Sequence, residues 1–482
     1  MNDPDIRFTR YQNRNDSYVI STESGFPERI WRELDEINIG SQANANRELL
    51  LLKNKANLKF GAAYTYKTRN YDVKSFALNI RNLVLTGDPN ELFLPENLWP
   101  YNGNVNSGTT YEVSFIPDNP NQYNANVNNI AAYGSMEFIP IKKLTTILGV
   151  RMEKYTQRYT GQDQLGTNVL DNDIVLDELN LFPTLNMIYA LGEKQNLRFS
   201  YSKTIARPSF KELSYAEIYD PITGRVFIGG LFRDANDFTG VVYWDGKLQS
   251  TDIHNFDMRW EIFLENEQLI SAGVFYKQFY EIIEIVQFAT QTGSFQPRNV
   301  GDGRIAGAEL ELRKNLQFAT EKLKNFNVSA NFTLADSRIE MSNTEYESRV
   351  DNARTGQVID TYRPMAGQAP YIINAGFSYS DKNDGNLRGL EAGLFYNVQG
   401  ITLLYVGIAD RPDIYTLPFQ SLNFNMSLYA DKDEKFQLGF KVDNLLNDKS
   451  ESVFQSFNAE DQYFTSLLQG RTFSFKLSYN FF

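Results

Sequence analysis

The sequence predicts an all-β protein, an antiparallel β-barrel of the type that spans an outer membrane. Apolar and polar residues alternate with period two along many segments, as in strands with two unlike faces. Most of these segments reach the ~9–11 residues that cross a bilayer at a tilt. The connections between them are alternately short and long, which is typical of outer-membrane barrels.

The amino-acid composition excludes several other classes of protein. The 482 residues carry 59 acidic and 47 basic side chains, a net charge of −12, one histidine and no cysteine. The mean hydropathy is −0.41, and no window approaches ~18 consecutive apolar residues, which excludes a bundle of transmembrane helices. The lack of cysteine excludes disulfides, thiolate metal sites and cysteine nucleophiles. The acidic balance argues against nucleic acid as a partner, because such binding needs a basic face.

Alternation is clearest in residues 256–264, 326–334, 422–428 and 472–481. Because lipid requires apolar side chains on one face of each strand, we expect a lipid face that includes Phe326, Val328, Phe332, Phe424, Met426, Phe473, Phe475 and Leu477. Similar runs start near Ile30, Lys55, Asn124, Leu144, Glu178, Gln195, Gln268, Gln296, Arg363, Leu387, Asp413 and Glu434. Together these runs predict about fifteen strands.

The connections differ in length. Short ones are Ile139–Lys143, Gly192–Lys194, Glu265–Glu267, Lys382–Asn386 and Asp431–Asp433. Long polar ones are Lys74–Tyr123, Thr160–Asp177, Phe210–Leu248, Glu340–Tyr362 and Asp448–Gln469. A soluble β-sandwich is the alternative, but its strands are nearer ~5–6 residues and its loops are not segregated by length.

The side chains at the polar positions support the same class. Several are charged, among them Arg259, Glu261, Glu309, Glu311 and Lys441, as expected of a wide and wet lumen. Many tyrosines fall near strand ends, where an aromatic belt would meet lipid headgroups. The alternative is that tyrosine favours strands in general.

Whether the number of strands is odd or even indicates whether they form a whole barrel. Bacterial single-chain barrels have an even strand number, yet about fifteen strands leave Ile30–Asn44 without an upstream partner, unless Ile6–Tyr11 is the stub of a further strand. Met1–Asp5 also lacks the basic start and apolar run of a signal peptide. We therefore expect the carboxy-terminal part of a larger barrel, in which the strand at Ile30 pairs poorly or not at all with Gly470–Phe482.

Four segments resemble TonB-dependent outer-membrane receptors, particularly the Bacteroidetes type. They are Phe199–Leu213, Pro297–Leu316 with its Gly307-Ala308-Glu309 pattern, Val442–Asp448 and the aromatic end Leu477–Phe482. The last resembles the signal read by the barrel-assembly machinery, here Phe473, Phe475, Leu477, Tyr479, Phe481 and Phe482. Phe482 departs from this pattern because the alternating register ends at Phe481.

The resemblance implies a 22-stranded barrel, of which residues 1–482 would supply about 15–16 carboxy-terminal strands without the plug domain or the first strands. It implies active uptake, across the cell outer membrane, of a large scarce nutrient such as a siderophore, cobalamin, glycan or peptide. The implied partners are outer-membrane lipids, the TonB complex through the plug, the barrel-assembly machinery and a surface lipoprotein. It implies neither an enzyme nor a cofactor.

The long loop Phe210–Leu248 is the candidate ligand contact. It combines aromatic and basic side chains, which suit stacking on sugars or aromatic chelators: Tyr215, Tyr219, Arg225, Phe227, Arg233, Tyr243 and Trp244. The alternative is that a loop of this size packs on its own aromatic residues.

Three other functions stay open. A passive porin needs an even strand number and no plug. An outer-membrane hydrolase would have to use His254, the single histidine, for which a solvated loop-end residue is the alternative. Calcium could bind acidic loop residues, although their spacing matches no calcium loop: Asp171, Asp173, Asp177, Glu178, Glu460 and Asp461.

Overall fold

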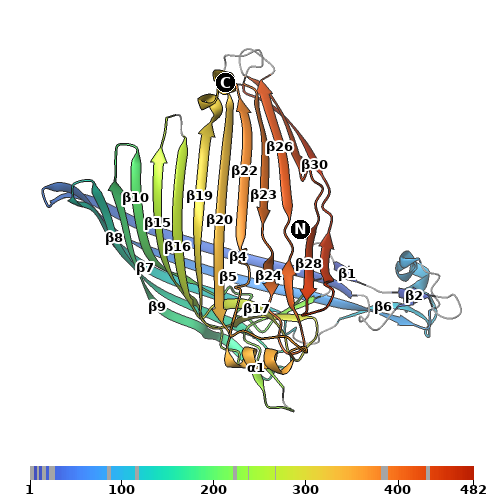
Figure 1. Ribbon diagram of the computed structural model, residues 1–482. Coiled ribbons are helices and arrows are strands. Elements are labelled where there is room, and N and C mark those ends of the chain that lie inside the picture. Colours follow the sequence, from blue (N-terminus) through green and yellow to red (C-terminus); the bar gives the residue numbers. More distant parts are fainter. Residues whose placement is uncertain are drawn as a thin grey trace.

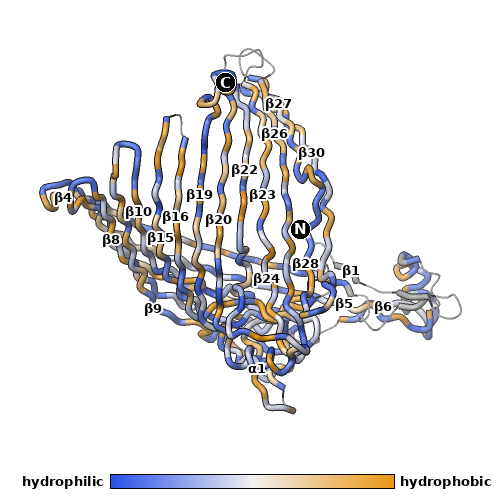
Figure 2. The backbone as a smooth tube through the Cα atoms, viewed as in Figure 1, coloured by the Kyte–Doolittle hydropathy of each residue, from blue (hydrophilic) through white to orange (hydrophobic). Residues whose placement is uncertain are grey.

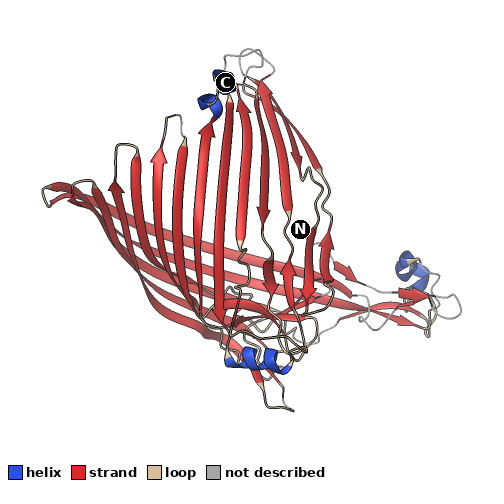
Figure 3. Cartoon of the chain, viewed as in Figure 1, coloured by secondary structure: helices blue, strands red, loops and turns tan. Residues whose placement is uncertain are grey.

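The computed structural model describes residues 5–7, 10–12, 18–20 and 28–481, apart from 84–87, 114–118, 221–224, 237, 266–267, 382–388 and 430–434. Within these residues one sheet contains eighteen strands, and it curves as a deep trough (Figures 1 and 3). Fifteen of its strands are long: β4 (Glu28–Leu51), β5 (Asn54–Arg81), β7 (Tyr123–Ile141), β8 (Leu144–Gln162), β9 (Val169–Ala190), β10 (Gln195–Ala206), β15 (Thr251–Phe263), β16 (Leu269–Tyr280), β19 (Gly303–Asn315), β20 (Phe326–Glu340), β22 (Tyr371–Ser380), β23 (Glu391–Gln399), β26 (Gln420–Tyr429), β27 (Phe436–Asp443) and β30 (Thr472–Tyr479). The predicted antiparallel fold class is confirmed.

Each long strand pairs antiparallel with the next long strand along the chain, from β4 to β30. Tight turns join them at one end, where Leu52 and Lys53 connect β4 to β5 with φ of 54° and 65°, as in a type I′ hairpin. Most of the long connections gather at the other end, together with the helix α1 (Asn343–Asp351), whereas the connection that carries β6 (Gly108–Val113) projects to the side (Figure 1). The expected segregation of short turns and long loops is therefore confirmed in general. The predicted long loop Thr160–Asp177 is wrong: β8 runs to Gln162 and β9 begins at Val169, so a short turn joins them and Asp171, Asp173 and Asp177 lie in a strand.

The register places apolar and polar residues on opposite faces. Residues directly opposite in a ladder share a face, and one such row is Phe326, Tyr379, Ala392, Met426, Phe440 and Phe475. The next row is Asn327, Ser378, Gly393, Asn425, Lys441 and Ser474. All eight residues of the predicted lipid face lie on the apolar face, and Figure 2 shows the alternation along the wall.

The two edges of the sheet do not meet. β30 pairs with β27 on one side, and β4 pairs with β5 along its whole length. β4 has one further partner, β1 (Asp5–Arg7), which pairs with Glu28–Ile30. In the described part of the chain no ladder joins β30 to β4. The expectation that the strand at Ile30 would not pair with the last strand is confirmed. β1 overlaps only the start of the expected stub Ile6–Tyr11, since Arg10 and Tyr11 lie in β2 (Arg10–Gln12), which pairs with β3 (Tyr18–Ile20).

Three strand assignments from the sequence are wrong. The runs near Gln296, Arg363 and Asp413 are not wall strands; they lie in β18 (Ser294–Asn299), β21 (Tyr362–Arg363) and β25 (Asp413–Thr416). The wall strands begin further on, at Gly303, Tyr371 and Gln420. Alternation marks any strand with two unlike faces, so it cannot separate a wall strand from a loop strand.

The end of the chain also differs slightly from expectation. β30 stops at Tyr479, so Phe481 follows the strand instead of ending it, and its side chain is exposed. Phe482 lies outside the described residues. Phe473, Phe475, Leu477 and Tyr479 do alternate on the apolar face of β30, as predicted.

Small sheets fold the long loops. One contains β11 (Glu217–Asp220), β12 (Arg225–Ile228), β18 and β17 (Ile283–Gln287). Another contains β24 (Thr402–Tyr405), β25, β28 (Ser450–Gln455) and β29 (Gln462–Leu467). Shorter pieces are β2 (Arg10–Gln12), β3 (Tyr18–Ile20), β6 (Gly108–Val113), β13 (Asp234–Ala235) and β14 (Val242–Trp244). Among the described residues no helix is long and apolar enough to span a bilayer.

Candidate functional site

Five long loops fold together at one end of the wall: 207–250, 281–302, 341–370, 400–419 and 444–471, here called the loop assembly. Its largest apolar cluster takes buried residues from several of these loops and from the adjoining strand ends: Ile282, Val286, Val300, Ile305, Ile339, Met365, Leu403, Val406 and Ile408. Burial of apolar surface between loops stabilises them as a unit. The assembly is therefore an organised structure at one end of the wall.

A buried ion network ties three of these loops together. Arg363 Nη1 lies 2.7 Å from Glu284 Oε2, and Arg363 Nε lies 2.6 Å from Glu345 Oε1. Arg349 Nη2 lies 3.0 Å from Glu345 Oε1 and 2.9 Å from Asp413 Oδ1. Burial opposes the charge on Arg363, but the carboxylates of Glu284 and Glu345 outweigh it and raise the pKa of the guanidinium.

Two further arginines cross-link loops. Arg298 Nη2 lies 2.5 Å from Asp234 Oδ2, and both side chains are buried. Arg411 donates to the main-chain oxygens of Phe288 and Ala289. Sequence reasoning missed these contacts, since nothing in the spacing of single charged loop residues shows which ones meet.

The loop after β10 is anchored to the polar face of the wall by aromatic rings. Tyr71, Tyr123 and Tyr159 stand in a row, with centroids 5.3 and 5.7 Å apart, and Tyr215 of the loop continues it at 6.3 Å. The Tyr215 amide donates to Tyr159 Oη at 3.2 Å. Aromatic pairs at such separations stabilise a contact beyond their buried area, so this loop is fixed to the wall.

The structure places four of the five predicted aromatic contacts in packing roles: Tyr215, Tyr219, Tyr243 and Trp244. Tyr215 and Tyr219 pack against the buried wall cluster, and Tyr243 packs against the largest loop cluster. Trp244 packs in a separate cluster, where its Nε1 donates to the oxygen of Gly230 at 2.8 Å. These contacts are those of a loop that packs on its own aromatic residues.

The other three predicted contacts are Arg225, Phe227 and Arg233. The guanidinium of Arg225 lies 5.2 Å from the ring centroid of Phe464, and Lys211 Nζ lies 3.9 Å from that of Phe227. The Arg233 side chain is exposed. The seven residues do not gather around one described cavity, and their role in ligand binding stays a prediction.

His254 lies on the apolar face of the wall, opposite Lys203 on β10. Its Nδ1 is 3.0 Å from Tyr201 Oη, and its ring also contacts Tyr280. The partners described for its ring are aromatic, whereas a serine hydrolase needs a serine and a carboxylate on the imidazole. Within the described residues no three His, Cys, Asp or Glu side chains gather as a metal site requires.

The polar face of the wall carries a ladder of charges near the turn end. Glu261 is 2.5 Å from Arg198 and 3.6 Å from Arg259. Glu311 is 2.7 Å from both Arg259 and Arg313. Each of these charges has a partner of opposite sign, either on its own strand or across the strands, and such pairs stabilise the polar face.

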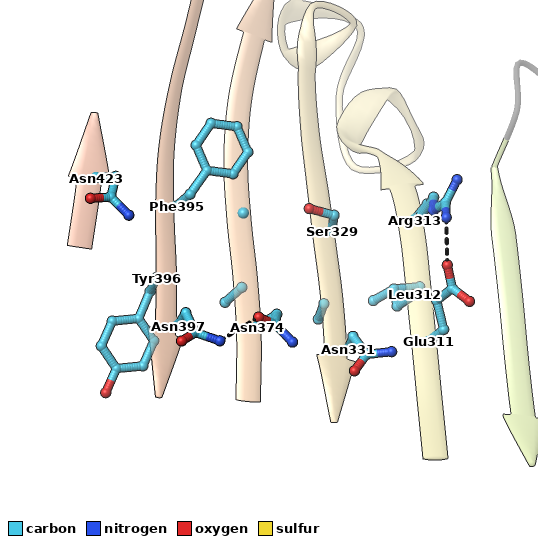
Figure 4. Close-up of a pocket in the computed structure, with 13 residues that line it drawn as sticks. Glu311, Leu312, Arg313, Ser329, Asn331, Asn374, Phe395, Tyr396, Asn397 and Asn423 are labelled. Carbon is cyan, nitrogen blue, oxygen red and sulfur yellow. Dashed lines mark hydrogen bonds and ion pairs between the residues drawn. The ribbon is translucent and has the colours of Figure 1, made fainter. Parts of the chain in front are cut away.

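Beside this ladder lies a hollow of about 410 Å³, here called the wall recess (Figure 4). Two adjacent rows of the polar face form most of it. One row is Arg313, Ser329, Gly376, Phe395 and Asn423, and the other is Glu311, Asn331, Asn374 and Asn397. The recess presents the ring of Phe395, several amides and one ion pair, and Tyr396 is also among the residues that line it.

Most of the chain matches a known protein family. The family model described as "TonB dependent receptor-like, beta-barrel" matches residues 2–445. This chain belongs to the TonB-dependent receptor family. Barrels of this family lie in the outer membrane, and its members are transporters and not enzymes, so these expectations are confirmed for the family. The Bacteroidetes type stays a prediction.

Solved TonB-dependent receptors show the same fold at low sequence identity. The ferric citrate transporter FecA aligns with a TM-score of 0.61 at 12% identity, over 96% of this chain and 57% of its own. The ferric yersiniabactin uptake receptor FyuA from Yersinia pestis aligns with a TM-score of 0.56 at 14% identity, over 97% of this chain and 57% of its own. The copper transporter OprC aligns with a TM-score of 0.57 at 14% identity, over 95% of this chain and 57% of its own. No curated protein sequence matches the chain.

This chain thus spans a little over half the length of those solved receptors. In a TonB-dependent receptor barrel the apolar face meets lipid and the polar face lines the lumen. The wall recess is then a lumenal feature near the turn end, and the loop assembly lies at the opposite end of the barrel.

Proposed function

We propose that residues 1–482 form the carboxy-terminal barrel portion of an outer-membrane TonB-dependent transporter that takes up a large scarce nutrient. The family match over residues 2–445 carries this proposal. Two features of the wall support it: its outward rows are apolar and its inward rows are polar and charged, as a wide aqueous lumen requires. The plug domain and the first strands would lie outside this chain.

The proposed partners follow from the same architecture. Lipids would cover the apolar face, and the TonB complex would act through the plug. The barrel-assembly machinery would read the last strand, where Phe473, Phe475 and Leu477 are well exposed on the apolar face. A surface lipoprotein would bind at the loop assembly.

The substrate class stays open among siderophore, cobalamin, glycan and peptide. The aligned receptors are named for ferric citrate, ferric yersiniabactin and copper, but their identity to this chain is too low to transfer a ligand. The porin and hydrolase alternatives have weaker support, because the family match favours active transport and the described partners of His254 are aromatic.

The test is uptake in cells that express the full-length gene. Growth is measured on a panel of ferric siderophores, cobalamin, oligosaccharides and peptides, with and without a functional TonB. We expect growth on at least one of these nutrients to require both the gene and TonB. Growth that requires the gene but not TonB would contradict the proposal and support a passive channel.

A further inference from the structure

The apolar face of five central wall strands, β10, β15, β16, β19 and β20, changes character toward the loop end. Two successive rows across these strands are wholly apolar: Leu197, Trp260, Ala272, Leu310 and Phe332, then Phe199, Met258, Val274, Ala308 and Leu334. The next row toward the loops begins with Tyr201, Phe256 and Tyr276, whose ring centroids are 4.9 and 6.3 Å apart. Aromatic girdles mark the boundary between hydrocarbon and lipid headgroups, so the membrane boundary lies at this row.

The row one step beyond the aromatic row carries the first basic side chains on this face. It contains one residue from each strand and is here called the basic row: Lys203, His254, Gln278, Arg304 and Arg338. Rows two residues apart are separated by about 6–7 Å along a strand, which places the basic row at the level of the headgroups. Since the long loops of such barrels are extracellular, these headgroups belong to the outer leaflet.

Two arginines of the basic row face each other. Arg304 lies directly opposite Arg338 in the ladder between β19 and β20, and both side chains are exposed. Like charges directly opposite in a ladder are destabilising. Arg338 Nε has an acid partner on its own strand, 3.0 Å from Asp336 Oδ2, whereas Arg304 makes no hydrogen bond or ion pair to a described residue. The pair therefore lacks one counter-charge, which an external anion would supply.

The charges around this pair decide from which side an anion can approach. Asp302 and Glu340 come two residues beyond Arg304 and Arg338 toward the loops, and both are exposed. A soluble anion that arrived from the loop side would meet these carboxylates first. On the membrane side, Arg304 is followed on its strand by the small and uncharged Ala306. The phosphate of a lipid whose chains pack on the apolar rows would reach the arginines from this side.

We propose that Arg304 and Arg338 bind a phosphate group in the headgroup of an outer-leaflet lipid. A guanidinium group donates two parallel hydrogen bonds to phosphate oxygens, and a phosphate between the two arginines would replace their repulsion by attraction. The site is on the apolar face, in the middle of the wall, with five long strands on either side (Figure 1). Neither a plug in the lumen nor strands added at the open edges would cover it, and the proposal does not depend on what is transported.

Binding is tested on the full-length receptor, purified from outer membranes and freed of lipid in detergent. Native mass spectrometry follows titration with diphosphoryl lipid A, which carries two phosphate groups on a sugar headgroup, and with the same lipid after removal of both phosphates. EDTA is present throughout, so that no divalent cation can bridge a phosphate to Asp302 or Glu340. We expect the phosphorylated lipid to bind about tenfold or more tightly than the dephosphorylated one, because hydrogen bonds between charged groups are among the strongest.

The variants test the two arginines separately from the fold. Arg304→Gln should weaken binding of diphosphoryl lipid A about tenfold, and Arg304→Lys, which keeps the charge, should bind more tightly than Arg304→Gln. The matched control is Lys314→Gln, because Lys314 lies on the same face of the same strand at the turn end, opposite Val328. This control should bind the lipid as the parent protein does. A heat-modifiable band on electrophoresis shows that each variant is folded.

Four outcomes would overturn the proposal. Equal binding of the lipid with and without its phosphates would show that only its acyl chains are held. Unchanged binding by Arg304→Gln, or an equal loss in Lys314→Gln, would remove the site from the basic row. Binding that disappears in EDTA would assign the phosphate to a bridging cation. Inorganic phosphate that binds by itself, with the same dependence on Arg304, would make this a site for a soluble anion.

Discussion

Arg363 and Glu284 come from different loops and meet in the interior of the loop assembly. Their side chains are 5% and 3% exposed, and Nη1 and Oε2 are 2.7 Å apart. Glu284 Oε1 also accepts a hydrogen bond from the Ala366 amide at 2.6 Å. Arg363 also pairs with Glu345, but removal of Arg363 leaves Glu284 as a buried carboxylate without its arginine, which is far more costly than the pair itself is stabilising.

Arg363→Met should therefore unfold the loop assembly locally, at a cost of about 3–5 kcal/mol, while the wall strands stay paired. Hydrogen exchange of residues 341–370, measured by mass spectrometry, checks this expectation. The control is Arg354→Ala, an exposed arginine of the same loop, which should change stability by less than ~0.5 kcal/mol. Equal exchange in the two variants would show that the buried network does not hold the loops.

The two faces of β30 predict opposite responses to arginine. Phe475 lies opposite Phe440, and Ser474 lies opposite Lys441. Phe475→Arg should cost about 2–4 kcal/mol because its charge would enter hydrocarbon, whereas Ser474→Arg should be mild in a wet lumen. Denaturant unfolding of the barrel in lipid vesicles measures both. Similar losses for the two variants would contradict the assignment of faces.

His254→Ala should leave ligand capture within a factor of about two. The substitution removes one hydrogen bond to Tyr201, worth ~1 kcal/mol or less where water can replace it. Binding of the transported nutrient to whole cells gives the comparison. If the purified protein has a hydrolytic activity that disappears in this variant, the result would instead support the hydrolase alternative.

The turn after β8 should lose order in acid. Asp163 accepts hydrogen bonds from Thr167 and Asn168; burial raises its pKa, but these bonds outweigh burial and hold it below the ordinary value of 3.8. A carboxyl group with a lowered pKa stabilises the fold fully above its ordinary pKa and loses that effect as the pH falls through the lowered value.

Amide exchange of Thr167 and Asn168 should therefore accelerate, beyond the intrinsic effect of pH, as the pH falls from above the ordinary pKa of 3.8 through the lowered pKa of Asp163. Asp163→Asn lacks the titrating group, so its turn should show no such acid-dependent step. An identical step in that variant would assign the transition to another group.

In the described residues no ladder joins β30 to β4, and β4 pairs with β1 only at Glu28–Ile30. These open edges predict how the chain behaves alone. An open edge cannot persist in hydrocarbon, because each unsatisfied amide there costs several kcal/mol. Residues 1–482 produced alone should aggregate or close wrongly, whereas the full-length product should give a heat-modifiable monomer on electrophoresis. A stable, well-dispersed monomer of residues 1–482 in lipid would contradict the fragment proposal.

The sequence predicted the wall well because a lipid-facing strand obeys a strict local rule. Alternation located Phe326, Met426 and Phe475 on one face, and their ladders confirm it. The same rule failed at Gln296 and Asp413, where loop strands alternate for packing reasons of their own.

The functional regions were harder to predict because their contacts join residues far apart in the sequence. The basic row needs the register of five strands before Arg304 can be seen opposite Arg338, and that register depends on turn lengths and long-range pairing. In the loop after β10, composition pointed to Tyr215 and Trp244 as ligand contacts, but composition alone cannot show that both rings pack inward.

The interloop ion network has a consequence for engineering and for divergence between related receptors. Arg363 depends on Glu284 and Glu345, while Arg349 depends on Asp413. A graft that replaced residues 341–370 alone would remove both arginines and leave Glu284 as a buried carboxylate without its arginine. Replacement of either of the other two loops would leave Arg363 and Arg349 paired with Glu345. A chimaera that exchanges residues 341–370 therefore has to carry the loop of Glu284 with them.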